Sequence, residues 1–492
     1  MAEVACAEQN WLVIATRVTA QQLARLLGGP PLTHPRYVDL AARVRMLLVD
    51  GRLAASTRLP SERSLADGLG LSRTTVAAAY ARLRDAGFVE ARRGSGHVTT
   101  GLVGLPTTMV ASPVPPGVVG LTFAAGPAPT QVATAFGRAV ERMGPLLAGP
   151  GYLPEGLPEL RARIADRYAA RGLPTRPDQI VVTSGAVAAL NVVLRTVLTT
   201  GDRVVCESPT YPGALDAIQR AGGRGVPWPL TDDGWDHDRL EVLLRQSAPR
   251  LAYLVPDFHN PTGRLMSGDH RAETARLLRR HGVLPVIDET TCELRLEGPV
   301  AAPFAWTSPE AITIGSASKS YWGGLRIGWI RAPRDLVRPL VEQRAILDLA
   351  SPVFEQLVLA DLLERAHEVL PLHRERLLTG RDALVAAVRE HLPSWRFRVP
   401  DGGLALWCEL PEALGTATTV EAERRGVVVA PGPVFAVEGG FDRFVRIPWT
   451  ASPDDLVEAV RRLAAAWEHV SGHAWNAPRP ATQSAAGRVM VA

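Results

Sequence analysis

The chain has 492 residues, more than one hydrophobic core usually spans, so its length predicts two or more domains. Hydrophobic residues make up 46% of the chain and charged residues 21%, which is typical of an ordinary soluble globular protein. No run approaches eighteen consecutive apolar residues, and no basic start followed by an apolar run marks a secretory signal. We therefore expect a cytoplasmic protein without a membrane span.

The positive charge is concentrated near the N-terminus. The whole chain carries a formal charge of +4, whereas residues 35–100 contain eleven arginines and six acidic residues, which gives this segment +5. A small basic unit attached to a large, nearly neutral one predicts a polyanionic partner for the small unit. The four cysteines lie far apart, without the spacing of a metal site or a disulfide framework, so we expect idle thiols and no metal.

Residues 35–100 have the pattern of a winged helix-turn-helix, preceded by an N-terminal extension, residues 1–34. Apolar residues at helical spacing over 38–50 predict a first helix, and a second begins at Pro60-Ser61 and ends by Gly70. Ser72 is expected to cap a third helix. On that helix a buried stripe is predicted from apolar residues at positions i, i+3, i+4 and i+7, namely Val76, Ala79, Tyr80 and Leu83.

Two short strands, 88–92 and 97–99, are expected to flank a basic, glycine-rich hairpin tip that can lie along DNA. A three-helix protein-interaction module is the alternative, but helix pair, cap, basic first turn and basic wing occur here in the order of a DNA reader. The segment resembles the GntR-type winged helix through LPSER (59–63), SRTTV (72–76) and RRGSG (92–96). From the pattern and this resemblance we expect DNA contacts at Arg63, Ser72, Arg73, Thr74, Thr75, Arg92, Arg93, Gly94, Ser95 and Gly96.

A connector and a body follow the head. Residues 101–121 are rich in Pro, Gly and small residues without a period, which predicts an extended, flexible linker. Over residues 122–470 short β-branched runs such as IVVTSG, RVVCES, LAYLVPD, LPVIDE and AITIGS alternate with helix-length stretches, which predicts an α/β domain with a mainly parallel central sheet. Residues 471–492 are polar and rich in small residues, so we expect a disordered tail.

Residues that could bind a ligand follow several of these strands. In parallel sheets, ligands bind at these strand ends. Residues 183–187 (TSGAV) offer backbone N–H groups at a helix start to a phosphate. Residues 207–213 could hold the Tyr211 ring over a flat ligand, and residues 260–263 (NPTG) form a turn. Each of the three could instead be structural, as a helix start, a core tyrosine and an ordinary turn.

The strongest signal is the single lysine of the chain. All other basic residues are arginine, and an amine, unlike a guanidinium, can form a Schiff base with an aldehyde. Taken alone, Lys319 could be a surviving surface lysine, but the residues around it favour an attachment point for pyridoxal phosphate (PLP). Asp288 ends a strand, where its carboxylate could pair with a protonated pyridine nitrogen. Ser316, Ser318 and Arg326 are suited to a phosphate, and Arg446 to a bidentate grip on a carboxylate.

These groups occur in the order found in fold-type I aminotransferases, which residues 121–470 resemble. The resemblance implies PLP as cofactor, Lys319 as its Schiff-base residue and Arg446 as the binding residue for an effector carboxylate. It also implies cofactor contacts from Gly185, Ala186, Tyr211, Asn260, Asp288, Ser316, Ser318 and Arg326, and from Tyr152 to the phosphate of a partner subunit. Two residues depart from the family pattern, because Val187 replaces a polar residue and Thr290 replaces the tyrosine that binds the phenolic oxygen O3′ of PLP.

Together the two halves resemble the MocR subfamily of GntR-type bacterial transcriptional regulators. The resemblance implies a homodimer on double-stranded DNA with two half-sites, associated with the nucleoid when bound, and PLP or a small amino compound as effector. An active PLP-dependent aminotransferase carrying a DNA-binding head is the alternative, and complete transamination between an amino donor and a keto acid would favour it. A third hypothesis, a regulator whose body has lost PLP, is disfavoured by Lys319 and Asp288.

Overall fold

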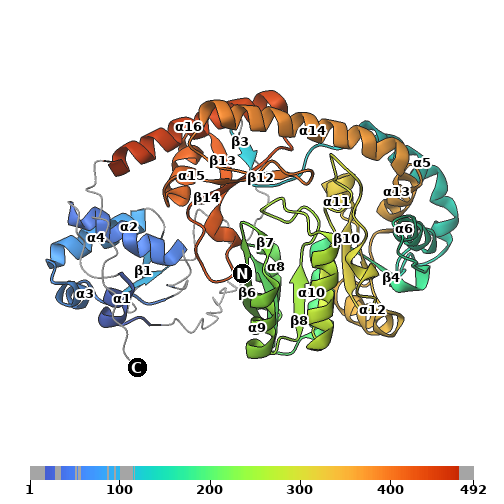
Figure 1. Ribbon diagram of the computed structural model, residues 1–492, viewed down its shortest axis with the longest axis horizontal. Coiled ribbons are helices and arrows are strands. Elements are labelled where there is room, and N and C mark those ends of the chain that lie inside the picture. The colour runs from blue at the N-terminus through green and yellow to red at the C-terminus, as the bar shows by residue number, and fades with distance from the viewer. Residues whose placement is uncertain are drawn as a thin grey trace, which may run out of the picture.

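A computed structural model of the chain describes residues 17–27, 35–49, 53, 57–85, 88–92, 96–99, 115 and 117–475. Within these ranges it contains a small helical head with a β-hairpin and a larger α/β body with two sheets (Figure 1). The wing residues Arg93, Gly94 and Ser95 lie outside the described residues, as do most of the linker and of the tail.

The head has the elements that the sequence predicts, with one helix in addition. They are α1 (Ala20–Leu27), α2 (Arg36–Val49), α3 (Glu62–Leu69), α4 (Arg73–Asp85), β1 (Val89–Arg92) and β2 (Gly96–Thr99). Ser61 caps α3 by accepting a hydrogen bond from the Ser64 amide at 3.1 Å, and Gly70 ends it with a φ of +63°, a conformation that glycine adopts without strain. Both predicted helix boundaries are therefore confirmed.

The third predicted helix, α4, begins as expected. The Ser72 hydroxyl accepts a hydrogen bond from the Thr75 amide at 3.0 Å, which is the predicted N-cap. The predicted stripe is buried, because Val76, Ala79 and Tyr80 are fully covered and Leu83 is 2% exposed. The additional helix α1 contributes Leu23 and Leu27 to the same core, so the packed head begins before residue 35.

The body is built on an eight-stranded sheet. Its strands are β4 (Ile180–Thr183), β5 (Arg203–Ser208), β6 (Arg224–Thr231), β7 (Gly234–Trp235), β8 (Leu251–Leu254), β9 (Leu284–Asp288), β10 (Ile312–Ser316) and β11 (Gly328–Arg331). They lie in the order β4-β11-β10-β9-β8-β5-β6-β7. The run from β10 to β6 is parallel, and β11 and β7 are antiparallel to their neighbours, so the prediction of a mainly parallel sheet is confirmed.

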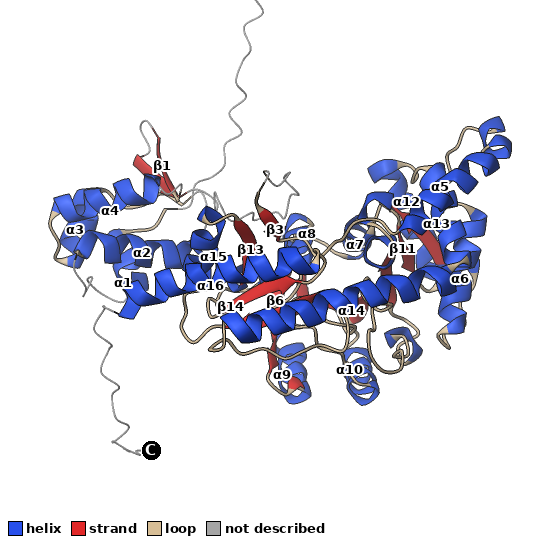
Figure 2. Cartoon of the chain, turned by 90° about the horizontal axis from the view of Figure 1, so that it is seen from above, coloured by secondary structure: helices blue, strands red, loops and turns tan. Residues whose placement is uncertain are grey.

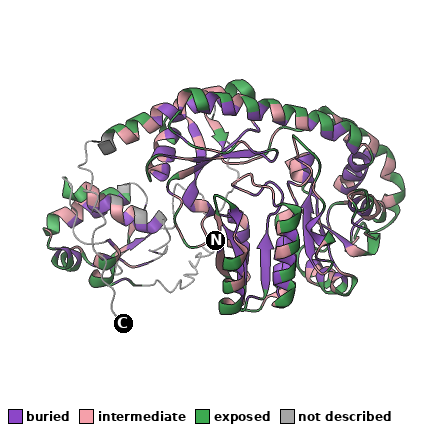
Figure 3. Cartoon of the chain, in the orientation of Figure 1, coloured by how far each residue is buried: buried purple, intermediate pink, exposed green. Residues whose placement is uncertain are grey.

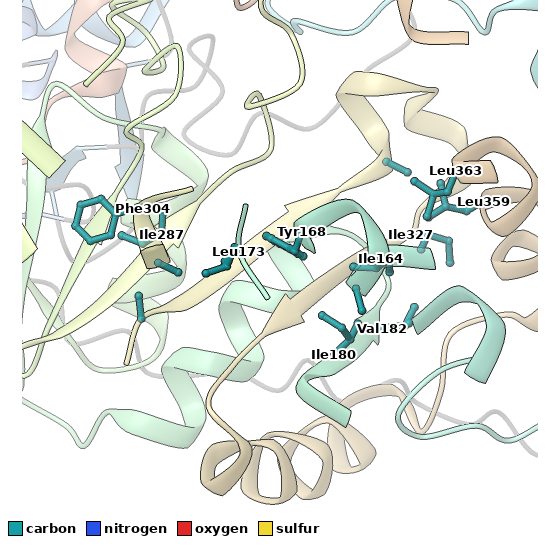
Figure 4. Close-up of a cluster of buried hydrophobic side chains, with 14 of the residues drawn as sticks. Ile164, Tyr168, Leu173, Ile180, Val182, Ile287, Phe304, Ile327, Leu359 and Leu363 are labelled. Carbon is teal, nitrogen blue, oxygen red and sulfur yellow. The ribbon is translucent and has the colours of Figure 1, made fainter. Parts of the chain in front are cut away.

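Both faces of this sheet are buried, which explains why its strands are continuous apolar runs. One face packs under α5 (Thr130–Arg142), α6 (Pro158–Ala170), α9 (His237–Ser247), α10 (Gly268–Arg280) and α13 (Val353–Glu364). Figure 4 shows part of this core, in which Ile164 and Tyr168 of α6 lie near Ile180 and Val182 of β4. The other face packs under α7 (Ala186–Val197), α8 (Pro212–Arg220) and α12 (Arg334–Asp348), so the large part of the body has three layers (Figure 3).

A second, smaller sheet holds the C-terminal part of the body. Its strands lie in the order β12 (Ala405–Glu409), β14 (Phe444–Pro448), β13 (Val427–Pro431) and β3 (Val119–Leu121). The helices α14 (Ala366–His391), α15 (Gly415–Arg424) and α16 (Pro453–Trp475) pack against it, with α14 and α16 in contact along their lengths (Figure 2). The short helix α11 (Ala317–Ser320) follows β10 in the large sheet.

Two segments near the predicted domain boundaries are ordered into the body. β3 pairs in parallel with β13, so the last three residues of the expected linker belong to the small sheet. Leu121 is buried there, which gives the strand an apolar anchor. Helix α16 continues to Trp475, five residues into the segment for which the sequence predicts disorder.

No helix in the described part of the chain is both long and apolar enough to cross a membrane. The same residues contain no cluster of three His, Cys, Asp or Glu side chains that could hold a metal ion.

Candidate functional site

The residues that the sequence singles out in the body meet in one cavity, although they are spread over more than 250 positions. Its volume is about 200 Å³, and it lies where β9 and β10 end and the small sheet begins. The predicted site residues that line it are Ala186, Tyr211, Asn260, Asp288, Ser316, Ser318, Lys319, Arg326 and Arg446. Convergence of strand ends therefore brings the predicted pieces together.

Lys319 occupies α11, directly after the end of β10. Its amine donates a hydrogen bond to the backbone carbonyl of Ala124 at 2.8 Å, and the ring of His373 is 2.9 Å from the Lys319 carbonyl. Burial, and next the positive charge of Arg446, lower the pKa of the Lys319 amine to about 8. The neutral, nucleophilic form of the amine is therefore far more abundant near pH 7 than it is in an ordinary lysine.

Asp288 ends β9 as predicted and is only 8% exposed. Its carboxylate accepts hydrogen bonds from the Tyr253 hydroxyl at 2.7 Å and from the Thr290 amide at 2.9 Å. Burial raises the pKa of Asp288, whereas these two donors and the nearby Lys319 amine oppose the rise. The carboxylate is thus fixed in direction and desolvated, which suits it to a buried cationic partner.

The turn between β4 and α7 is shaped for a close approach of an anion. Gly185 has a φ of +102°, and a Cβ built on it would lie 2.8 Å from a guanidinium nitrogen of Arg326, so only glycine fits this position. Arg326 itself donates to the Ser184 carbonyl at 3.2 Å. The Ser316 hydroxyl lies 3.1 Å from that of Ser318, across the same end of the cavity.

Tyr211, Asn260 and Arg446 also line the cavity. The Tyr211 ring lies against Gly213, where a Cβ would come within 2.7 Å of it. The Arg446 guanidinium, from β14, donates to the Asn260 side-chain oxygen at 3.1 Å and to the Thr122 carbonyl, while its buried Nε has no partner among the described residues. Burial lowers the pKa of Arg446 to about 10, which leaves it charged at neutral pH.

Tyr152 does not line this cavity. It is 65% exposed, and its expected contact with a partner subunit stays a prediction. Val187 and Thr290, the two departures from the family pattern, do line the cavity, so neither is a remote substitution.

Most of the predicted DNA-binding residues whose burial the structure describes are exposed on the head. Arg63 in α3 is exposed, and Arg73 and Thr74 are exposed in the first turn of α4. The Ser72 hydroxyl lies 2.8 Å and 2.7 Å from the hydroxyls of Thr74 and Thr75. Gly96 begins β2, and the described backbone of Arg92 ends β1, so both flank the wing tip.

Sequence reasoning missed several residues of the cavity. Tyr253 gave no signal apart from its place in a strand, yet it orients Asp288. The carbonyls of Thr122 and Ala124 contact the two principal cations, and backbone groups carry no sequence signature. Phe258, with a φ of +48°, projects into the cavity beside Asn260, and a left-handed backbone for phenylalanine cannot be read from composition.

These residues fit PLP. The amine, the buried carboxylate, the ring-stacking tyrosine and the glycine-dependent anion cradle are the groups that this cofactor requires, and all face one cavity. The fold and the cavity therefore define a fold-type I, PLP-dependent aminotransferase-like body joined to a winged helix-turn-helix.

Comparisons with known proteins agree with this class. The family described as "Aminotransferase class I and II" matches residues 132–463, and "Bacterial regulatory proteins, gntR family" matches residues 36–98. Among solved structures, the α-aminoadipate aminotransferase LysN from Thermus thermophilus, complexed with N-(5′-phosphopyridoxyl)-L-leucine, superposes with a TM-score of 0.67 at 27% identity. That superposition covers 73% of this chain and 94% of LysN.

Two relatives that are named as regulators show the family. A probable rhizopine catabolism regulatory protein, MocR, from Rhizobium meliloti is 30% identical over 77% of this chain and 83% of the relative. The pyridoxine biosynthesis transcriptional regulator PdxR from Corynebacterium glutamicum is 30% identical over 77% of this chain and 85% of the relative. The chain belongs to the MocR type of GntR-family transcriptional regulators, in which a helix-turn-helix head is fused to an aminotransferase-like body.

Proposed function

We propose that the body holds PLP on Lys319, senses PLP or an amino compound in the same cavity, and thereby controls how the heads bind DNA. The observation that carries this proposal is a pair of contacts between the cavity and the chain that leads to the head. We call residues 122–124 the linker-proximal segment, because they follow β3, the first strand after the linker.

The linker-proximal segment is held by the two residues that a ligand would engage. The Lys319 amine donates to the Ala124 carbonyl, and the Arg446 guanidinium donates to the Thr122 carbonyl. An amine that is bonded to a cofactor, and a guanidinium that grips a carboxylate, each lose freedom to make these contacts. Ligand binding would therefore release the linker-proximal segment, and β3 passes that change on toward the linker.

In this proposal each residue around the cofactor has one task. PLP, when bound, supplies an electron-withdrawing ring and a carbonyl carbon for amines. Asp288 would keep the pyridine nitrogen protonated, Tyr211 would pack against the ring and Asn260 would hold the O3′ side of the cofactor. The backbone at Gly185 and Ala186, together with Ser316, Ser318 and Arg326, binds the phosphate. Arg446 binds the carboxylate of an amino compound.

The head is proposed to bind double-stranded DNA with α4 in the major groove. Arg63, Ser72, Arg73, Thr74 and Thr75 would contact bases and phosphates there, while Arg92, Arg93, Gly94, Ser95 and Gly96 would bring the wing to the backbone. Such a regulator acts where the chromosome is, so we place it in the cytoplasm and on the nucleoid when it is bound.

We further propose that two copies form a homodimer, which presents two heads to two half-sites. Large apolar side chains are exposed at the end of α12, namely Ile346, Leu347 and Leu349, and Tyr152 is exposed as well. Two contacts tie this end of α12 to the segments near Tyr152 and Gly185, because Arg344 donates to the Pro154 carbonyl at 2.6 Å and Ser184 donates to Asp348 at 2.8 Å. A partner docked on this surface would place its own copy of Tyr152 close to the phosphate end of the cavity.

The visible absorption spectrum tests the cofactor part of the proposal. The protein purified with PLP should show an absorption band above the ultraviolet range that borohydride abolishes, and Lys319→Ala should lack it. Lys319→Arg is the matched control, because it keeps a positive charge but cannot bond covalently to an aldehyde. If neither PLP addition nor a change of pH produces a band in the wild type, the cofactor assignment is wrong.

A further inference from the structure

The lining of the cavity restricts the chemistry of the effector. Within the described residues, its acidic, basic and imidazole side chains are Asp288, Lys319, Arg326, Arg446 and His259, beside the hydroxyls of Tyr211 and Tyr253. The first three belong to the cofactor in the proposed function, on which this inference rests. His259 is completely buried, with one ring nitrogen 2.9 Å from the Thr262 hydroxyl and the other 3.4 Å from the Glu207 carboxylate. Arg446 is thus the single charged group left for an effector among these residues.

The surroundings of the Arg446 guanidinium favour binding of one anion. It is 1% exposed, and the two groups to which it donates hydrogen bonds, the Asn260 side-chain oxygen and the Thr122 carbonyl, are both neutral. Its Nε is buried and unpartnered among the described residues. A buried guanidinium without a counter-charge is costly, and a carboxylate both neutralises it and takes up its remaining donors.

The wall next to Arg446 is apolar. Ala405 lies on β12, the strand that pairs with the Arg446 strand, and Leu404 precedes it. Phe123 follows Thr122, whose carbonyl Arg446 contacts. Phe258 completes the wall, and all four residues line the cavity.

Phe258 is held in the wall by its neighbours. Its backbone has a φ of +48°, which is uncommon for a bulky residue, and its ring lies where a Cβ on Gly402 would come within 2.5 Å. No side chain larger than glycine fits at Gly402 without moving this ring. The local sequence therefore maintains a fixed aromatic surface in the cavity.

We propose that the effector is an amino acid with a single carboxylate and an uncharged, apolar side chain. Its carboxylate binds Arg446, and its side chain packs on Phe123, Phe258, Leu404 and Ala405. A second carboxylate or a distal ammonium group would be desolvated against this wall without a partner, which is strongly unfavourable. Among apolar side chains, the fit in the cavity decides affinity, and one extra or missing methylene changes it by about tenfold to 200-fold.

Titration of the visible band of the PLP-loaded, full-length protein tests this inference. Leucine and methionine should perturb the band at concentrations at least tenfold lower than glutamate, aspartate or lysine do. Isopentylamine, which is leucine without its carboxylate, should bind at least tenfold more weakly than leucine. Arg446→Gln should remove that difference while the band remains.

Two variants of Leu404 test the wall directly. Leu404→Arg places a cation there, so it should shift the preference toward glutamate by at least tenfold. Leu404→Met changes the shape but not the charge, and should keep the preference for leucine. Fluorescence melting of both variants checks that they are folded, and a variant that does not fold is replaced by Ala405→Arg.

The outcomes separate this inference from the proposed function. Absence of any band overturns both. A band that responds to glutamate at lower concentrations than to leucine, or that responds to no amino acid, overturns the effector class and leaves the cofactor assignment standing.

Discussion

At the scale of single residues, the surroundings of Lys319 change the reactivity of its amine. The cavity holds it beside Arg446 and Arg326, with Asp288 as the opposing negative charge. A pKa of about 8 leaves roughly one tenth of the amine neutral at pH 7, against about one part in 3,000 at an ordinary pKa near 10.5. The site therefore supplies its nucleophile without a separate base.

This pKa predicts how cofactor attachment depends on pH. Only the neutral amine reacts, so the rate at which PLP generates the visible band should rise about tenfold from pH 6 to 7 and level off above pH 8. Arg446→Gln removes a positive charge and should move the midpoint to higher pH. A rate that still climbs tenfold per pH unit above pH 9 would contradict the lowered pKa.

Thr290 permits a second prediction at this scale. The family tyrosine that donates to O3′ is absent here, and Thr290 lines the cavity with its amide bound to Asp288. Thr290→Tyr should supply the missing donor. A hydrogen bond to a charged oxygen contributes about 1.5–3 kcal/mol, so the dissociation constant of PLP should fall by about tenfold or more.

Equilibrium titration of apo-protein with PLP measures this change. Thr290→Phe is the matched control, because it adds the ring without the hydroxyl and should leave the affinity below that of Thr290→Tyr. Equal affinities of the two variants would show that the hydroxyl does not reach O3′.

At the scale of elements, the linker-proximal segment is the part of the body that reaches both the cavity and the linker. Its contacts with Lys319 and Arg446 should restrain residues 119–124 in the ligand-free protein. Saturating PLP should speed amide hydrogen exchange in these residues several-fold, since the Lys319 contact is lost. Arg446→Gln should speed it without ligand, whereas Arg443→Gln, whose guanidinium donates to the carbonyls of Leu410 and Pro411, should not. Unchanged exchange on PLP binding would remove this route to the linker.

Helix α4 gives the prediction for the head. The side chain of Arg73, at the start of α4, is 74% exposed. The ion pair of Arg73 with Glu62, at 3.3 Å, is a surface pair that adds little stability. Arg73→Ala should weaken DNA binding about fivefold or more without lowering the melting temperature. Arg84→Ala, in the last turn of the same helix, should change the affinity less than twofold. Electrophoretic mobility shifts at fixed salt measure both, and equal losses would place the DNA elsewhere.

The sequence predicts the elements that local patterns determine. The caps at Ser61 and Ser72, the buried stripe of α4 and the end of β9 at Asp288 follow from residue type and spacing. The closeness of Lys319 to Arg446 could be predicted only from the family resemblance, because the two residues are 127 positions apart in the chain and Arg446 belongs to the second sheet. The Tyr253 and Ala124 contacts depend on tertiary packing, and no local pattern could have predicted them.

At the scale of the whole molecule, the proposed regulator consists of two copies of the chain. Ile346 is 79% exposed in the single chain, so Ile346→Asp should leave each subunit folded while it disrupts the proposed interface. Sedimentation should show a shift from dimer to monomer, and affinity for DNA with two half-sites should fall at least tenfold while single-site affinity stays the same. Leu372→Asp, at an exposed position of α14, is the control. A dimeric Ile346→Asp protein would place the interface elsewhere.

The proposed function requires that ligand binding in the cavity controls how tightly the heads bind DNA. Its most direct test measures affinity for a DNA fragment selected by the wild type, at one salt concentration, with and without PLP, for the wild type and for Lys319→Ala. We predict that PLP changes the affinity of the wild type at least fivefold and leaves that of Lys319→Ala unchanged. If the wild type shows the visible band but binds DNA equally well with and without PLP and leucine, the body does not control the heads.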